Sequence, residues 1–299
     1  MASKVTIQDI ADALGVSRNT VSKAINNTGV LAAATRDKVL NKAQEMGYRL
    51  IMYRVIEEEI KELKLPVSFQ AERTAGIACI EIFDHEYCKM LCSLNIPLLF
   101  IDSPADGFNA PLEADRLYMD NRTEIYSFVK EMIRRGKNRI GFVGKYMHCQ
   151  SFYERYMSYR NAMYDMGLSC PEEYCLIENK QELSGYSRNS WNEYLTEYIR
   201  KMKNLPDVFI CANDSVALDV MQVLNSLNYS VPDDVYLCGF DDSPESRVVT
   251  PSLTTIHIHS QDIGLSAVQL LVSRIKEPFL NYRTMYIETN LIFRESTGD

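Results

Sequence analysis

The stretch Thr6–Asn27, TIQDIADALGVSRNTVSKAINN, predicts two short helices joined by a tight turn. Apolar residues recur at helical spacing in its first half, and Gly15 can adopt the left-handed backbone that ends a helix. Ser17 is a favourable N-cap for the second helix, in which Val21 and Ile25 face inward. The stretch therefore predicts a small helical unit with one polar outer face.

The outer face of the second helix carries Arg18, Asn19, Ser22, Lys23 and Asn26. Arginine and asparagine can make paired hydrogen bonds to base edges, while serine and lysine can reach phosphates. This face therefore suits a DNA groove. A helical hairpin whose polar face meets only water would show the same local pattern.

Charge distinguishes the N-terminal residues from the rest of the chain. A third helix over about 35–46 would close a small core with the first two. Residues 1–50 contain seven lysines and arginines against four acidic residues, whereas the whole chain has a net charge of −8. A basic head on an acidic body is typical of a phosphate-binding module attached to a soluble sensor.

Two segments, VTIQDIADALGVSRNTVSKAIN and TRDKVLNKAQEMGYR, resemble the DNA-binding head of the LacI/GalR family of bacterial transcription regulators. The resemblance resumes at MDNRTEIYSFVKEMIRRGKNRIGFVG, SFYERYMSYRNAM, FICANDSVALDVMQ and LIFRES. It implies an effector domain similar to periplasmic sugar-binding proteins, with two lobes and a ligand cleft. It also implies that Arg18, Asn19 and Lys23 read bases, and that the DNA backbone is contacted by Thr6, Ser17, Ser22 and Asn26.

The remainder of the chain predicts an α/β body, because apolar runs of strand length alternate with helical stretches. The expected strands are 76–80, 97–102, 139–144, 207–212 and 235–240, and the expected helices lie near 84–94, 122–135, 151–166, 190–203, 214–228 and 261–275. The predicted fold class is a small all-α helix-turn-helix domain followed by two lobes of doubly wound parallel α/β sheet.

The expected domains are a head at 1–50 and an effector-binding and dimerisation domain at 51–299. Within the latter we expect an N-lobe of about 51–121 plus 260–281, and a C-lobe of about 122–259 plus 282–299.

Polar residues at predicted strand ends are the candidate effector contacts. Asp102, Asn213 and Asp241 follow strands, and Arg155 lies on the helix after a strand. Paired donors and acceptors of this kind suit polyhydroxylated ligands, and the resemblance implies effector contacts at these four positions. The alternative is that such residues cap the next helix. Capping is the favoured interpretation for Asp214, and both interpretations stay open for Asp241.

The linker after the head departs from the family. Family members have a Pro-Asn pair, an Ala-Arg pair and a leucine that wedges into the minor groove. Residues 50–57 lack these, and Glu57 occupies the wedge position. Residues 55–64 predict an amphipathic helix with Ile56, Ile60 and Leu63 on one face, and LPVSF at 65–69 predicts a strand remnant. The chain is also shorter than most of the family, so an N-lobe segment is expected to be missing.

Other features limit the functional classes. No apolar run has the roughly 20 residues of a membrane span, and the N-terminus has no apolar signal region. We therefore expect a cytoplasmic, nucleoid-associated protein with no membrane partner and with reduced core cysteines.

Cys88 and Cys92 are too few ligands to predict a metal site. No catalytic motif includes the four histidines, His85, His148, His257 and His259. His257 and His259 are expected as polar positions of a strand, and we predict no enzyme activity, no cofactor and no metal.

The sequence thus predicts a homodimeric repressor that binds a near-palindromic double-stranded operator and is modulated by a sugar-like effector. One alternative is a DNA-binding regulator with a degenerate sensor domain that answers to a protein partner or to no ligand. Another is an enzyme or sugar-binding protein without DNA function, which would leave the basic head unexplained.

Overall fold

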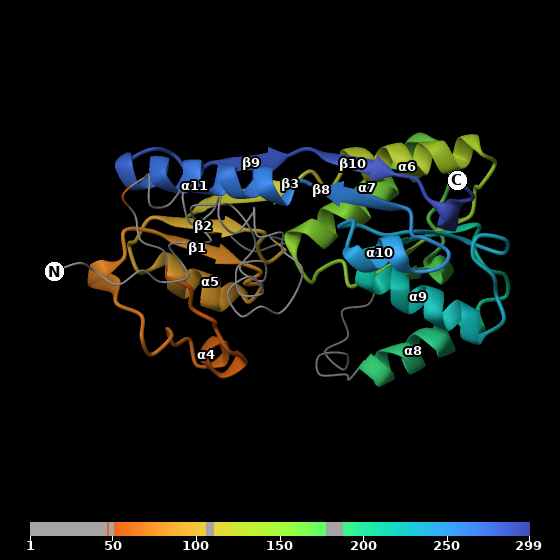
Figure 1. Ribbon diagram of the computed structural model, residues 1–299, viewed down its shortest axis with the longest axis horizontal. Coiled ribbons are helices and arrows are strands. Elements are labelled where there is room, and N and C mark those ends of the chain that lie inside the picture. The colour runs from red at the N-terminus through yellow and green to blue at the C-terminus, as the bar shows by residue number, and fades with distance from the viewer. Residues whose placement is uncertain (1–46, 48–50, 106–110, 178–187) are drawn as a thin grey trace. The chain divides into compact units, whose positions relative to one another are not determined.

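The computed structural model describes residues 47, 51–105, 111–177 and 188–299 (Figure 1). They form two units of parallel strands and helices. The first unit joins the described residues up to Met119 to His259–Ile287, and the second joins Asp120–Ile258 to Glu288–Asp299. The predicted α/β alternation is confirmed. The predicted domain limits stay a prediction, because the proposed head lies almost wholly outside the described residues.

The first unit has a sheet of four parallel strands and two main helices. In sheet order the strands are β1 (Ile77–Ile80), β2 (Leu98–Ile101), β3 (Asp115–Met119) and β9 (Thr284–Ile287). The helices that pack against this sheet are α5 (His85–Cys92) and α11 (Ser260–Lys276).

Strands β1 and β2 are buried on both faces of the sheet, since their alternate residues pack in opposite cores. On β2, Leu99 and Ile101 pack with α11, while Leu98 and Phe100 pack with α5. Strands covered on both faces read as continuous apolar runs, which is why β1 and β2 were predictable. We call the first core the α11-side cluster; it comprises Ala78, Ile80, Leu99, Ile101, Leu117, Ile263, Ala267, Leu270 and Leu271. We call the second the α5-side cluster; it comprises Cys79, Ile82, Tyr87, Cys88, Leu91, Leu98, Phe100, Leu112 and Ala114.

Strand β3 begins at a fully buried carboxylate, Asp115, and was not predicted. Asp115 accepts hydrogen bonds from Arg274 Nη2 and Arg283 Nη2, each at 2.7 Å. Burial alone would raise the pKa of this carboxyl, but the hydrogen bonds from the two guanidinium groups outweigh burial and leave the pKa below its ordinary value. A buried carboxylate is costly unless it is paired in this way.

The second unit has its own sheet of four parallel strands. In sheet order these are β5 (Cys175–Leu176), β4 (Ile140–Val143), β6 (Val208–Cys211) and β7 (Tyr236–Cys238). The helices are α6 (Thr123–Arg134), α7 (Gln150–Asp165), α8 (Arg188–Lys201), α9 (Asp214–Ser226) and α10 (Pro244–Val248). An antiparallel pair is formed by β8 (Thr255–Ile258) and β10 (Thr289–Ile292).

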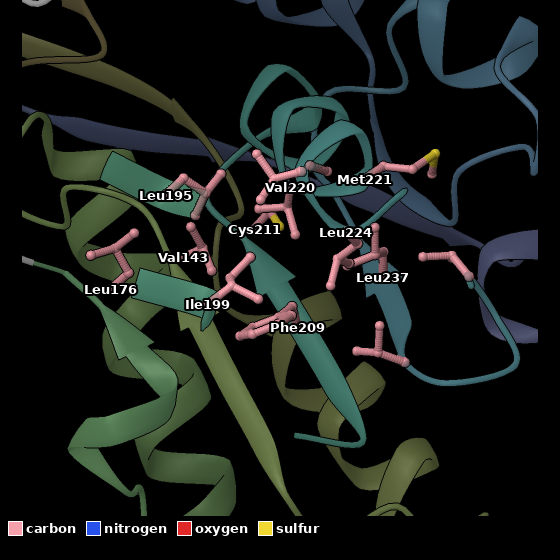
Figure 2. Packing of buried hydrophobic residues seen from close by; sticks show 14 of the residues in the cluster. Val143, Leu176, Leu195, Ile199, Phe209, Cys211, Val220, Met221, Leu224 and Leu237 are labelled. Atoms are coloured by element: carbon pink, nitrogen blue, oxygen red, sulfur yellow. The ribbon is translucent and has the colours of Figure 1, made fainter. Parts of the chain in front are cut away.

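The core of this second unit lies between its sheet and helices α8 and α9. Figure 2 shows Val143 and Phe209 of the sheet packed with Leu195 of α8 and Val220 of α9. Phe142, the neighbour of Val143, turns to the opposite face, where its ring lies 6.0 Å from that of Tyr159 on α7. The sheet is therefore covered on both faces, and the carboxyl ends of its strands are where side chains can meet a ligand.

The segment before β1 corrects two expectations. The predicted helix over 55–64 is reduced to α4 (Glu57–Lys61), which ends before Leu63, a residue with a left-handed backbone of φ +52°. The predicted strand remnant at 65–69 is instead a turn, closed by a hydrogen bond from Phe69 N to Pro66 O. Of the expected apolar face, only Ile60 packs against the core, because Ile56 and Leu63 are each 45% exposed.

Several further elements were missed or displaced. Besides β3, the strands and α-helices that were not predicted are β5, β9, β10 and α10. The strand expected around the paired histidines is β8, but it ends at Ile258, and His259 is the residue that precedes α11. The expectation of core cysteines is confirmed for six of the eight. Within the described ranges, no helix has the length and apolar character needed to cross a membrane.

Candidate functional site

Arg155 is the centre of a polar site in the second unit. It projects from α7 and is 3% exposed. Its Nε donates to Asn121 Oδ1 at 2.9 Å and its Nη1 donates to Ala212 O at 2.6 Å. The guanidinium carbon lies 3.5 Å from the centre of the Phe240 ring. Hydrogen bonds and a cation–π contact therefore fix this permanently charged group in one orientation.

Asp241 places a carboxylate beside Arg155. Its Oδ1 lies 3.9 Å from Arg155 Nη1, and its side chain is 37% exposed. Its φ of +114° is a backbone conformation that non-glycine residues rarely adopt. The conformation is held by a hydrogen bond from Asp241 N to Ile256 O. Unusual backbone of this kind is often found at functional sites, where the surrounding structure compensates its cost.

Asn213, and not Asp214, caps helix α9. Asn213, a predicted effector contact, is the N-cap of α9, and its Oδ1 accepts a hydrogen bond from Val216 N at 3.0 Å. The prediction that Asp214 is the cap is wrong. Asp214 is the first residue of the helix, directly after the cap, and it is buried.

The buried carboxylate of Asp214 instead ties three segments of the second unit together. It accepts hydrogen bonds from Ser243 N at 2.7 Å and from Thr255 Oγ1 at 2.5 Å. Burial raises the pKa of this carboxyl. A Cβ atom on Gly239 would lie 2.1 Å from Asp214 Oδ1, so only glycine leaves room for the carboxylate.

A second polar network next to Arg155 was not found from the sequence. Asn121 Nδ2 donates to Ser151 Oγ at 3.2 Å and to Glu154 Oε2 at 3.1 Å, and all three residues are buried. Asn121 also accepts the hydrogen bond from Arg155, so it links the guanidinium to this network. No pattern in the sequence singled out Asn121.

Asp242 forms an ion cluster beside the site. Its carboxylate accepts hydrogen bonds from Arg247 Nη2 and Arg294 Nη2 and contacts His257 Nδ1 at 2.9 Å. Burial alone would raise the pKa of Asp242, but the hydrogen bonds from the two arginines outweigh it and the pKa lies below its ordinary value. Because both arginines bind this carboxylate, we interpret the cluster as one that stabilises the segment after β7.

Asp102, the remaining predicted effector contact, belongs to the first unit. It follows β2, is 9% exposed and has a φ of +57°. Its Oδ1 accepts a hydrogen bond from Ser103 N, and Ser103 Oγ lies 2.7 Å from Tyr118 OH. Glu81, which sequence reasoning did not single out, has the same left-handed backbone at the end of β1. Carboxylates on unusual backbone thus follow strands in this unit as well.

The structure brings three of the four predicted effector contacts close together. Arg155 and Asp241 are brought together, and the hydrogen bond to Ala212 O places Arg155 next to Asn213. A fixed cation and a partly exposed carboxylate offer a donor and an acceptor.

The predicted DNA contacts Thr6, Ser17, Arg18, Asn19, Ser22, Lys23 and Asn26 lie outside the described residues. Among the residues that the structure describes, no group of His, Cys, Asp and Glu side chains is arranged to hold a metal ion.

Comparison with protein families divides the chain into two matched regions. Residues 6–49 match the family described as bacterial regulatory proteins, lacI family. Residues 129–297, more than half of the chain, match the family described as periplasmic binding protein-like domain. The predicted fold class, a helix-turn-helix head followed by a two-lobed α/β body, is confirmed by these matches.

Curated relatives are similar over almost their whole length. The HTH-type transcriptional regulator GalR of Lacticaseibacillus casei is 27% identical, with 98% of this chain and 99% of the relative covered. The HTH-type transcriptional repressor PurR of Photobacterium profundum is 24% identical, with 98% and 99% covered. The alignment with GalR is 334 positions long, whereas this chain has 299 residues.

Solved structures share the fold. The transcriptional regulator CelR in complex with cellobiose superposes with a TM-score of 0.64 at 21% identity, covering 98% of this chain and all of that one. The transcription regulator CcpA of Lactococcus lactis superposes with a TM-score of 0.70 at 20% identity, covering 85% of this chain and 90% of that one.

Proposed function

Because this chain belongs to the LacI/GalR family of bacterial transcription regulators, we propose that it is a repressor that binds a near-palindromic operator as a homodimer and responds to a small carbohydrate-like effector. It is a DNA-binding transcription regulator, and its curated relatives include repressors. The proposal adds the operator symmetry, the dimer and the class of effector.

The observation that carries the effector proposal is the fixed guanidinium of Arg155 beside the carboxylate of Asp241. Two hydrogen bonds and the Phe240 ring fix the orientation of the guanidinium through groups of the protein itself, and a preorganised group costs less to bind. Sugars present several hydroxyl groups, each of which can donate and accept. We propose that Arg155, Asn213 and Asp241 contact the effector, and the resemblance to the family proposes Asp102 as a further effector contact.

The proposed division of the chain follows from this. Residues 1–50 form the head, with Thr6, Ser17, Arg18, Asn19, Ser22, Lys23 and Asn26 at the DNA, and residues 51–299 bind the effector and pair the two subunits. The protein would act in the cytoplasm, at the nucleoid. The effector would work by stabilising one arrangement of the body over another, which is the only way a ligand can shift such an equilibrium.

The alternative, a regulator with a degenerate sensor, is supported by the first unit. A turn replaces the strand remnant expected before β1, and the described part of this unit has four strands in its sheet. Such a protein would bind DNA without a sugar response, or would answer to a protein partner.

Isothermal calorimetry and thermal melting with cellobiose, ribose and D-xylulose separate the two. These sugars appear in the names of the relatives and similar structures CelR, the ribose operon repressor and a xylulofuranose complex. A saturable heat and a raised melting temperature with any one of them support the effector proposal. If none of the three sugars produces heat or a shift in melting temperature, and DNA binding is intact, the result supports the degenerate sensor.

A further inference from the structure

Two cysteines of the second unit, Cys170 and Cys175, flank one short turn. Cys170 is half-buried and Cys175 is buried. Between them lies the 3-10 helix η2 (Glu172–Tyr174), which is closed by a hydrogen bond from Tyr174 N to Pro171 O at 3.0 Å. Cys175 ends this turn and begins β5, which pairs with β4. The two thiols are therefore held near the two ends of a single turn.

The hydroxyl of Tyr159 links the two thiols. Tyr159 lies on α7 and its side chain is fully buried. Its hydroxyl donates to Ile140 O at 2.7 Å and lies 3.7 Å from Cys175 Sγ. The same side chain also interacts with the thiol of Cys170. Both thiols therefore lie around one hydroxyl group whose own position is fixed by a hydrogen bond to the sheet.

The turn that carries the two cysteines is packed on both sides. A Cβ atom on Gly141 of β4 would lie 2.3 Å from Tyr174 O, so only glycine lets the turn lie directly against this strand. On the other side, the hydroxyl of Tyr198 on α8 donates to Glu173 O at 3.1 Å. The turn therefore cannot move away from Tyr159 unless it separates from β4 and α8.

The surroundings of the two thiols favour a bond between them over two free thiolates. Burial raises the pKa of both thiols, and the hydrogen bond with Tyr159 and the charge of Arg160 offset only part of this rise. A raised pKa means that little thiolate is present, so attack on an oxidant is slow. It also means that the reduced pair is not stabilised as thiolate, which favours the disulfide at equilibrium.

We propose that Cys170 and Cys175 are a redox modification site, at which a low-molecular-weight disulfide oxidises the pair to an intramolecular disulfide. Cys170, the more exposed thiol, loses its proton and attacks one sulfur of the external disulfide, which expels a thiolate and leaves a mixed disulfide. Cys175 then loses its proton and attacks the Cys170 sulfur, and the second external thiolate leaves. The two protons end on the two released thiols, so the pair loses two electrons and the external disulfide gains them.

The site lies next to the helix that carries the proposed effector contact. Tyr159 follows Arg155 on α7 by four residues, about one helical turn. A disulfide would change the sulfur atoms around the Tyr159 hydroxyl and hence the packing beside this helix. The inference itself goes beyond the proposed function and does not depend on it.

The test uses the reduced full chain, with oxidised glutathione as the external disulfide. After incubation, free thiols are blocked with iodoacetamide, the chain is cleaved with trypsin and the peptides are weighed by mass spectrometry. Both cysteines stay in one peptide, residues 161–180, because no lysine or arginine lies between Arg160 and Lys180. We expect this peptide to be unalkylated and lighter by two hydrogen atoms, and to become alkylated when dithiothreitol is added before the iodoacetamide.

Three variants separate the two steps. In Cys175→Ser the second step is lost, so glutathione should remain attached at Cys170. In Cys170→Ser the attacking thiol is lost, and Cys175 should remain unmodified. The matched control is Cys92→Ser, which removes another half-buried cysteine and should leave the disulfide in peptide 161–180 unchanged.

The wild-type result decides the proposal even where Cys175→Ser does not fold. Two alkylated cysteines in peptide 161–180 after treatment with oxidised glutathione overturn it. Glutathione that stays attached at Cys170 in the wild-type chain also overturns it, because Cys175 would then fail to complete the exchange.

Discussion

The guanidinium of Arg155 lies over the ring of Phe240 at 3.5 Å, and the residue after that phenylalanine, Asp241, places its carboxylate 3.9 Å from the same guanidinium. One short segment after β7 therefore supplies both an aromatic support and an acceptor. The cation is buried, yet the neighbouring carboxylate is partly exposed. The effector proposal rests on this combination of a rigidly held cation and an accessible carboxylate.

Replacing Arg155 by lysine should weaken the binding of sugar. Lysine keeps the charge but cannot donate to Asn121 and Ala212 in two fixed directions, so the donor loses its orientation. We expect the Kd for whichever sugar binds the wild-type chain to rise at least about tenfold, equivalent to about 1.4 kcal/mol. The matched control is Arg139→Lys, whose guanidinium is half exposed and pairs with Asp207 at the surface. Unchanged calorimetric affinity in Arg155→Lys would remove this residue from the effector site.

Gly239→Ala should destabilise the second unit more than an alanine at Gly136. The added methyl would lie 2.1 Å from Asp214 Oδ1 and would displace a buried carboxylate from its hydrogen bonds, at a cost of about 3 kcal/mol. At Gly136 no atom lies within 4 Å, and the φ of +81° alone costs about 1 kcal/mol. Urea unfolding of the two variants measures the difference. Equal free energies of unfolding would show that the loop yields to the methyl group.

The ion cluster of Asp242 predicts a specific dependence of stability on pH. Because the pKa of this carboxyl is lowered by folding, its stabilisation is present above its unfolded pKa, near the ordinary 3.8, and is lost as the pH falls through the lower folded value. The free-energy gap between the wild-type chain and Asp242→Asn should therefore be constant above about pH 5 and shrink below about pH 4. Urea midpoints measured from pH 7 to pH 3 test this. If the difference in unfolding free energy did not change with pH, the pKa of Asp242 would be the same in the folded and unfolded states.

In the head, Arg18→Ala should relax base preference by about 1–3 kcal/mol at one base pair, because a bidentate contact to a base edge is lost. Lys38→Ala, by contrast, should weaken binding to every duplex equally or have little effect. Competition assays measure the affinity of both variants. They use a duplex that the wild-type chain selects from a pool of random sequences, which we call the selected duplex, and its single-base variants. Equal losses on selected and random DNA for Arg18→Ala would refute a base-reading role.

Much of the fold could be predicted because local signals were strong. The continuous apolar run of β2 and the periodic helix α6 are dictated by residues close in sequence. Strand β3 could not be predicted in this way. It begins with Asp115, whose burial depends on Arg274 and Arg283, and these partners lie more than 150 residues away in the chain.

The candidate site was predictable as a set of residues but not as a set of roles. The motif around Asn213 and Asp214 placed polar groups at the end of β6, yet the assignment of cap and buried carboxylate depends on a shift of one residue. Asn121 gave no distinct signal, because its importance comes from Arg155 and Glu154 on another element.

The most direct test of the account is the Kd of the full chain for its selected duplex and for a random duplex of the same length, measured over a series of salt concentrations. We predict a preference of about a thousandfold or more for the selected duplex, and an affinity for both that falls steeply as salt rises, because the basic head displaces counterions from phosphates. Equal and salt-insensitive affinity for the two duplexes would contradict the account.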